Sequence, residues 1–130
     1  GITPFRSIVM NAANEKLPHR ILLFYSNHRP EDAAFLEELQ ALEQQNPNYK
    51  LIATMTAMEK SHRPWKGETG QINGQLLDRH LRAVASPHWY SSGSIYYIAG
   101  PPQMVRGLQT MLTNAGVDGD YIRIEEFSGY

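Results

Sequence analysis

The sequence predicts an α/β fold of three layers, in which a parallel sheet carries helices on both faces. Short apolar runs rich in β-branched and aromatic residues alternate with segments of helical periodicity. The order is helix then strand, four times over, and this alternation is typical of a parallel sheet wrapped by helices. A chain of 130 residues, 42% of them hydrophobic, suffices for one domain with one core. We therefore expect a single domain over residues 1–130.

Four runs are predicted to be buried strands, and they span residues 20–25, 49–55, 94–99 and 120–125. The first and the third are almost continuously apolar. Such runs are typical of parallel strands that are covered on both faces. These two strands are therefore expected to lie inside the sheet.

The first two predicted helices carry start signals. Thr3 is expected to cap a helix that runs to about residue 13, with Pro4 at its first position. Pro30 is expected to open the second helix, because Glu31 and Asp32 then place negative charge at its positive end. Apolar residues at helical spacing continue that helix to about residue 42.

The other two predicted helices flank the third strand. One spans about residues 73–84, and the last begins at Pro101 and Pro102 and ends near Gly116, which suits a helix C-cap. The longest irregular stretch, residues 57–72, precedes the third helix. A loop of this length in a small domain is often functional.

Composition excludes several function classes. The formal net charge of −1 argues against a nucleic-acid partner. The chain has no cysteine, so it has no disulfide, thiolate nucleophile or cysteine zinc site, which is compatible with a reducing compartment. We expect a location in the cytoplasm or on the cytoplasmic face of a membrane-attached parent. The five histidines lack metal-ligand spacing, and we expect no metal site.

Two glycine turns are candidates for holding a nucleotide. Gly1 precedes the first helix, where Thr3 offers a hydroxyl at an end that attracts anions. Gly100 follows the third strand. Pro101 and Pro102 come next; they fix the backbone conformation at the start of the following helix and remove two N–H donors from it. Two such turns at neighbouring strand ends would flank a ligand crevice. The alternative is that both are ordinary strand-to-helix turns.

Five blocks of sequence resemble one family in the order that family shows. They are GITPFRS (1–7), YSNHRPEDAAFLEEL (25–39), WKGETGQIN (65–73), IAGPPQMV (98–105) and EEFSGY (125–130). The chain resembles the NAD(P)-binding domain of ferredoxin–NADP reductase-like flavin oxidoreductases. The resemblance implies a preceding β-barrel domain of the same polypeptide that holds FAD or FMN, and hydride transfer from NAD(P)H to that flavin. This chain alone would then be inactive.

The resemblance and the turns together give a set of cofactor-binding candidates. They are Gly1, Thr3, Pro4, Ser26, Asn27, Arg29, Thr56, Gly100, Pro101, Pro102 and Met104. Arginine near the end of a second strand can accommodate the 2′-phosphate of NADP, whereas an acid there binds the ribose of NAD. Arg29 therefore gives a weak preference for NADP over NAD, and a solvated turn arginine is the alternative.

The resemblance also places the carboxyl-terminal tail at the junction of nicotinamide and flavin. Glu126, Phe127 and Tyr130 are the catalytic candidates: an aromatic ring could cover the flavin, and a carboxylate could orient the amide or relay a proton. A second hypothesis is a nucleotide-binding regulatory module without hydride transfer. An interaction domain of flavodoxin-like shape is a third, but the strand ends lack the clustered acids of phosphorylated receivers.

The sequence departs from the family in two places. Ala99 stands where many members have cysteine before the Gly-Pro-Pro turn. The family's first strand, central in the order 3-2-1-4-5, is missing before Gly1. Unpaired buried backbone groups cost about 1–3 kcal/mol each. We therefore expect strand 20–25 to pair directly with strand 94–99, or another chain to fill the gap by self-association.

Overall fold

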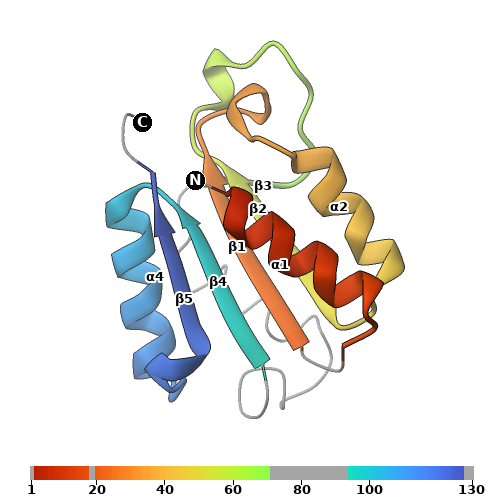
Figure 1. The fold of residues 1–130 in the computed structure, drawn as a ribbon. Coiled ribbons are helices and arrows are strands. Elements are labelled where there is room, and N and C mark those ends of the chain that lie inside the picture. The colour runs from red at the N-terminus through yellow and green to blue at the C-terminus, as the bar shows by residue number, and fades with distance from the viewer. Residues whose placement is uncertain (1, 18–19, 71–93, 128–130) are drawn as a thin grey trace.

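The computed structural model describes residues 2–17, 20–70 and 94–127, which form a parallel sheet flanked by helices (Figure 1). The predicted helix 73–84 lies outside these residues. The elements in chain order are α1 (Thr3–Asn14), β1 (Arg20–Asn27), η1 (Pro30–Asp32), α2 (Leu36–Gln45), β2 (Tyr49–Met55), η2 (Met58–Lys60), β3 (Glu68–Thr69), β4 (Ser94–Gly100), α4 (Pro102–Asn114), η3 (Gly119–Tyr121) and β5 (Ile122–Glu126), where η marks a 3-10 turn.

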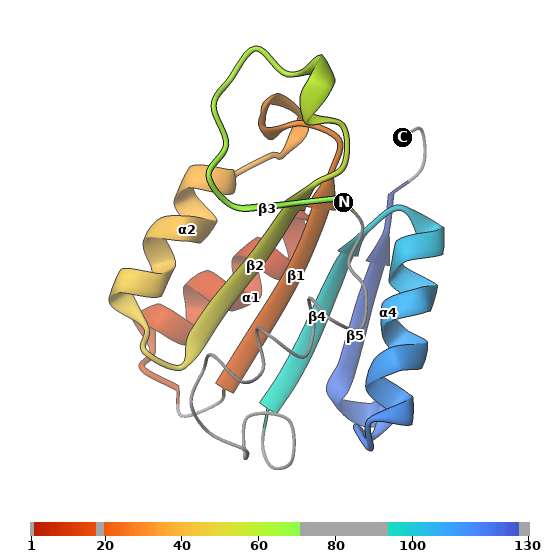
Figure 2. The same cartoon turned by 180° about the vertical axis from the view of Figure 1, so that it is seen from behind.

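The five strands lie in the order β3-β2-β1-β4-β5, and all pairs are parallel. The central strand β1 sets Ile21 opposite Tyr49 of β2 and opposite Ile95 of β4. The direct pairing of the first and third predicted strands is thereby confirmed (Figure 2). It leaves no vacant strand position for another chain between β1 and β4.

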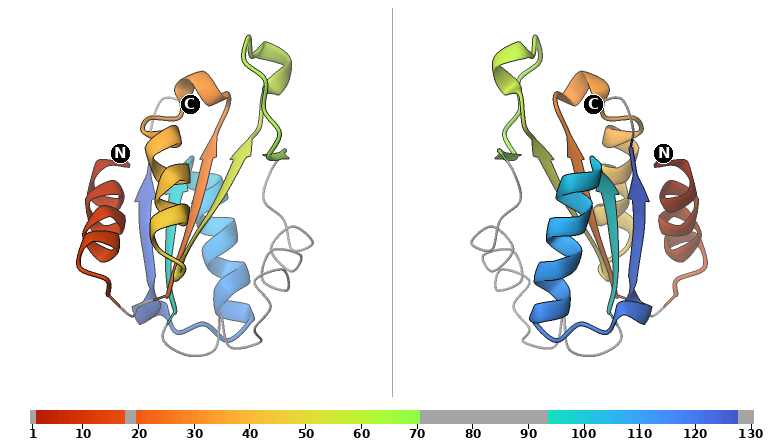
Figure 3. Two further views of the ribbon diagram at one scale, coloured as in Figure 1. Left: turned by 90° about the vertical axis from the view of Figure 1, so that its right-hand side faces the viewer. Right: turned by 90° about the vertical axis from the view of Figure 1, so that its left-hand side faces the viewer.

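The sheet is covered on both faces, as predicted, and separates two apolar cores (Figure 3). Alternate side chains of β1 enter opposite cores because successive strand residues point to opposite faces. The core under α1 and α2 includes Phe5, Val9, Ile21, Leu23, Tyr25, Leu39, Leu42, Leu51 and Tyr97. The core under α4 includes Leu22, Phe24, Ile52, Tyr96, Ile98, Val105, Leu108 and Leu112.

The start of α1 differs from the prediction. Ile2, not Thr3, is the residue that caps the helix, and the cap has no side-chain hydrogen bond. Ile2 is buried, so its side chain anchors the helix start by apolar contact, and Thr3 is already helical with an exposed side chain. Phe5 then packs edge-on against Tyr97 of β4, with ring centroids 4.9 Å apart. Packing on the sheet, rather than a hydroxyl cap, therefore places α1.

The second helix also begins later than predicted. Pro30–Asp32 form only a 3-10 turn, and α2 starts at Leu36 after Phe35 in a left-handed conformation, with φ of 60°. Such a conformation is costly for a bulky residue. The Arg6 guanidinium lies 4.5 Å from the Phe35 ring centroid and also pairs with Glu38 at 2.6 Å. These contacts with α1 help to hold the strained helix start.

The last helix follows the prediction closely. Pro102 is its first residue, and Gly116 beyond its end has a φ of 102°, which favours glycine. Strand β5 begins at Ile122, later than predicted, because Gly119–Tyr121 turn around the Asp118 side chain. None of the helices in the described ranges is long and apolar enough to cross a bilayer.

Candidate functional site

The carboxyl ends of the parallel strands meet at one edge of the sheet, together with the starts of α1 and α4 (Figure 1). Helices α1 and α2 cover one face, whereas α4 covers the other (Figure 3). The helical connections therefore change face between β1 and β4. Ligands of open α/β sheets bind outside the strand ends at such a switch point.

Gly100 ends β4 at this switch point, and its Cα is closely surrounded. A Cβ atom there would lie 2.4 Å from Met104 Cε, 3.1 Å from Ser26 Cβ and 3.3 Å from the Ser26 carbonyl oxygen. The position therefore has no room for a side chain. The predicted candidates Ser26, Gly100 and Met104 are thus brought together from β1, β4 and α4.

Ser26 contributes a buried hydroxyl beside the Gly100 turn. Its side chain is 1% exposed, and its Oγ has no hydrogen-bond partner among the described residues. Thr54 of β2 lies opposite Ser26 in the sheet. Unlike the Ser26 hydroxyl, the Thr54 hydroxyl has a hydrogen-bond partner, because its Oγ1 donates to the Gly70 carbonyl at 2.6 Å. A buried hydroxyl without a partner costs about 1–3 kcal/mol. The Ser26 hydroxyl is therefore a polar group that the described residues leave without a partner next to the Gly100 turn.

The loop after β2 is tied to the end of β1. The backbone N–H of Thr56 donates to the Asn27 carbonyl at 2.9 Å, and that of Ala57 donates to the His28 carbonyl at 2.8 Å. Asn27 is fully buried. The predicted candidates Asn27 and Thr56 are therefore neighbours at the same edge.

Arg29 lies just beyond β1 and is bound to its own turn. Its Nε and one terminal nitrogen donate to the two carboxylate oxygens of Asp32, both at 3.0 Å, and the other terminal nitrogen donates to the Lys60 carbonyl at 3.4 Å. The sequence interpretation treated Asp32 as a helix-start acid and missed this pair. The spacing Arg-x-x-Asp was the signal for it.

Glu31 was also interpreted only as a helix-start acid. Its carboxylate accepts hydrogen bonds from the Ser61 hydroxyl at 2.6 Å and from the His62 backbone N–H at 2.9 Å. Together with the contact from Arg29 to the Lys60 carbonyl, these bonds join η1 to the loop after β2. The loops that follow β1 and β2 are therefore held as one unit.

The Glu31 contacts predict a measurable pKa. The hydrogen bonds from Ser61 and His62 lower the pKa of Glu31 from 4.5 to about 2. Because the pKa is lower in the folded state, the stabilisation is complete above pH 4.5 and is lost as the pH falls through about 2. Carboxyl chemical shifts followed by NMR should show this pKa, and Ser61→Ala should raise it. An unchanged pKa in Ser61→Ala would contradict the geometry.

The tail candidates lie at the same edge in different environments. Glu126 ends β5 and lies 3.7 Å from Arg106, with both side chains in contact with solvent. Phe127 is only 9% exposed, and its ring meets Tyr25 edge-on with centroids 6.0 Å apart. Its backbone N–H donates to the Gly100 carbonyl at 2.8 Å. The structure therefore places Phe127 in the core beside the Gly100 turn.

The remaining candidates differ in how exposed the structure leaves them. Thr3 and Pro4 are exposed in the first turn of α1, and Pro101 and Pro102 are half-buried where α4 begins. Gly1 and Tyr130 lie outside the described residues. Ala99, which stands in the place of the family cysteine, is fully buried in the core under α1 and α2.

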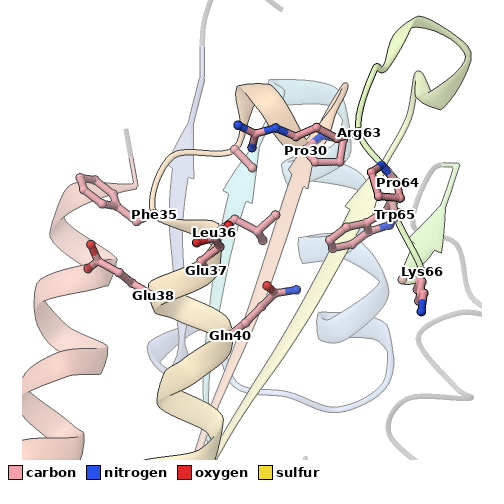
Figure 4. Close-up of a pocket in the computed structure, with 12 residues that line it drawn as sticks. Pro30, Phe35, Leu36, Glu37, Glu38, Gln40, Arg63, Pro64, Trp65 and Lys66 are labelled. Atoms are coloured by element: carbon pink, nitrogen blue, oxygen red, sulfur yellow. The ribbon is translucent and has the colours of Figure 1, made fainter.

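A separate cavity of about 660 Å³ lies between α2 and residues 63–67 (Figure 4). Trp65 forms one wall opposite Leu36 and Gln40. The indole N–H donates to the Glu68 carbonyl at 2.8 Å and fixes the ring. Trp65 also packs against the core under α1 and α2, so it anchors this loop.

A parallel sheet with helices on both faces and a glycine turn at its switch point defines a nucleotide-binding α/β domain. A profile described as "Oxidoreductase NAD-binding domain" matches residues 1–110. The chain belongs to this family of oxidoreductase NAD-binding domains.

Curated relatives are similar over the whole chain. One subunit of the Na(+)-translocating NADH-quinone reductase of Methylococcus capsulatus is 28% identical over 130 residues, and the same subunit in Pseudomonas aeruginosa is 27% identical. Each alignment covers 99% of this chain but 31% of the relative. The chain therefore spans about a third of the length of these relatives.

Solved structures show the same fold. The CS-b5R domains of human Ncb5or in the NAD+ form have a TM-score of 0.71 and 21% identity, over 95% of this chain and 33% of theirs. The FAD/NAD-binding domain of nitric oxide dioxygenase from Vibrio cholerae has a TM-score of 0.68 and 18% identity, over 98% of this chain and 47% of its own. These structures confirm the predicted fold, and the matching profile confirms the predicted family.

Proposed function

We propose that this chain binds NAD(P)H and presents its nicotinamide to FAD or FMN held by a β-barrel domain of the same polypeptide. The observation that carries the proposal is the close packing of Gly100 against Ser26 and Met104 at the switch point of a family NAD-binding domain. NAD(P)H, when bound, supplies a hydride, and the protein contributes orientation and exclusion of water.

The residues at the switch-point edge of the sheet would bind different parts of the dinucleotide. Gly100 permits close approach of the nicotinamide ring, and Pro101, Pro102 and Met104 shape the wall beside it. The unpartnered Ser26 hydroxyl supports a polar contact to the ligand. The start of α1, with Gly1, Thr3 and Pro4, would face the diphosphate through the positive end of the helix dipole.

The strand ends next to the Gly100 turn would hold the adenosine half. Asn27, Arg29 and Thr56 are the candidates there, and the bonds that join their loops support a preorganised surface. In the tail, Glu126 and Tyr130 are proposed at the junction with the flavin. We propose that Phe127 positions the Gly100 turn, because its ring is buried and its N–H binds the Gly100 carbonyl.

The whole protein would be larger than this chain. The relatives from the NADH-quinone reductase are about three times as long, which supports a flavin domain elsewhere in the polypeptide. Their name includes Na+ translocation, a process that requires a membrane. We therefore propose a parent enzyme with this domain in the cytoplasm or on the cytoplasmic face of a membrane.

Titration with NADH and with NADPH, followed by nicotinamide fluorescence, tests the proposal. Saturable binding with negligible turnover is expected for the chain alone. Reduction of the flavin by NAD(P)H is expected once a flavin domain is joined to it. Saturable binding without flavin reduction in the joined protein would instead indicate a regulatory module. Absence of binding in both proteins would overturn the proposal.

A further inference from the structure

Tyr25 lies near the end of the central strand β1, with a side chain that is only 1% exposed. Its ring meets the Phe127 ring edge-on, with centroids 6.0 Å apart. The backbone N–H of Phe127 in turn donates to the Gly100 carbonyl at 2.8 Å. The Tyr25 ring therefore supports the Gly100 turn through Phe127.

The hydroxyl at the tip of the same side chain holds a different segment, the one between η1 and α2. It donates to the Ala34 carbonyl at 3.1 Å, in a partly buried position. The neighbouring Ala33 N–H donates to the Pro30 carbonyl at 3.1 Å, which is a bond within the turn and does not join it to the sheet. The Tyr25 hydroxyl thus ties this segment to the central strand.

The segment needs such a tie because it is strained. Phe35 has a φ of 60°, which is costly for a bulky residue. The contacts of Arg6 with the Phe35 ring and with Glu38 also hold it, but they lie at the surface, where such interactions are worth little. A hydrogen bond from a buried side chain is screened less by water.

The position of Ala34 affects more than its own turn. It lies two residues beyond η1, in which the Glu31 carboxylate accepts hydrogen bonds from Ser61 and from the His62 backbone N–H. The turn after β1 and the loop after β2 are therefore joined to the segment that Tyr25 holds. One buried side chain thus contacts both the support of the Gly100 turn and the base of these two loops.

We propose that Tyr25 is a positioning residue that sets the spacing between the Gly100 turn and the loops after β1 and β2. This inference rests on the proposed function, in which the Gly100 turn meets the nicotinamide and the loops meet the adenosine half. A ligand that contacts two sites at once gains affinity from the second contact only when their spacing fits it. A ligand with one half alone does not depend on that spacing.

The test compares two variants of the 130-residue chain that each remove one hydroxyl from the same core. Tyr25→Phe keeps the ring beside Phe127 but loses the bond to Ala34. Tyr97→Phe is the matched control, because Tyr97 lies on the neighbouring strand β4 and its ring packs against Phe5 of α1 instead. Circular dichroism checks that both variants are folded.

Calorimetry gives the dissociation constants of NADH and of its two halves, AMP and reduced nicotinamide mononucleotide. We expect Tyr25→Phe to weaken NADH binding about fivefold, the size of one lost hydrogen bond, and to weaken binding of each half less than about twofold. Tyr97→Phe should leave all three constants unchanged. An unchanged constant for NADH in Tyr25→Phe, an equal loss for NADH and AMP, or the same loss in Tyr97→Phe would each overturn the inference.

Backbone NMR shifts test the tie to Ala34 without any ligand. Residues 33–36 should shift in Tyr25→Phe and stay in place in Tyr97→Phe, and unchanged shifts in Tyr25→Phe would overturn the inference even if NADH binds the wild type. If NADH binds neither the wild-type chain nor the protein joined to a flavin domain, the proposed function fails, whereas the NMR shifts still show whether Tyr25 holds this segment.

Discussion

Replacing Gly100 with alanine is expected to weaken NAD(P)H binding at least about tenfold and to destabilise the domain by about 1–3 kcal/mol. The added methyl group would meet Met104 Cε at 2.4 Å and the Ser26 Cβ and carbonyl oxygen at 3.1 and 3.3 Å. The Met104 methyl can move, whereas relief of the contacts with Ser26 requires the central strand to shift by a few tenths of an ångström. Chemical denaturation measures the effect on stability, and fluorescence titration measures the effect on binding.

Gly107 provides a matched control on the exposed face of α4. A Cβ there meets nothing within 4 Å, so Gly107→Ala should stabilise the helix by about 0.5–1 kcal/mol and leave binding unchanged. Adding Met104→Ala to Gly100→Ala should recover only part of the loss, because the contacts with Ser26 remain. Wild-type binding by Gly100→Ala would show that the Gly100 turn is not the nicotinamide site.

Replacing Phe127 with alanine is expected to destabilise the domain by about 3 kcal/mol, since it removes a buried ring from the core. The ring packs edge-on against Tyr25, which is itself 1% exposed, so a cavity would open beneath the Gly100 turn. Chemical denaturation gives the free energy of unfolding. Phe127→Leu should retain most of the stability, because it keeps an apolar side chain of similar size.

The same variants separate a positioning role from a catalytic role for Phe127. If Phe127 acts through Gly100, Phe127→Leu should preserve both dinucleotide binding and flavin reduction in the protein joined to a flavin domain. Full stability in Phe127→Ala, with flavin reduction alone impaired, would contradict the core placement and favour direct contact with the flavin.

Much of the sheet was predictable from local pattern. The predicted strand 49–55 matches β2, and β1 extends two residues past its predicted end, to Asn27. The apolar run ends at Tyr25, but Ser26 and Asn27 continue the strand because β1 pairs with β2 through Asn27. Polar residues at a strand end thus depend on the neighbouring strand, which a local pattern does not contain.

In the candidate site, too, local sequence predicted some features and not others. Gly100 and Met104 were predictable, because a glycine after a buried strand and before a proline-led helix marks such a turn. The late start of α2 was not predictable, since the conformation of Phe35 depends on Arg6 of another helix. Nor was the bond between Glu31 and Ser61, which joins residues thirty positions apart.

The sequence by itself determined the alternation of helices and strands, the parallel sheet and the glycine turn, because these follow from the periodicity and conformational preferences of neighbouring residues. Only the tertiary structure decided that β1 pairs directly with β4, that Phe127 is buried against Tyr25, and that Arg29 is occupied by Asp32 and the Lys60 carbonyl. The physical reason is that these contacts join segments that only packing of the whole domain brings together. Several groups compete for the same hydrogen-bond partners and the same apolar surface, so a local stretch of sequence does not show which contact forms.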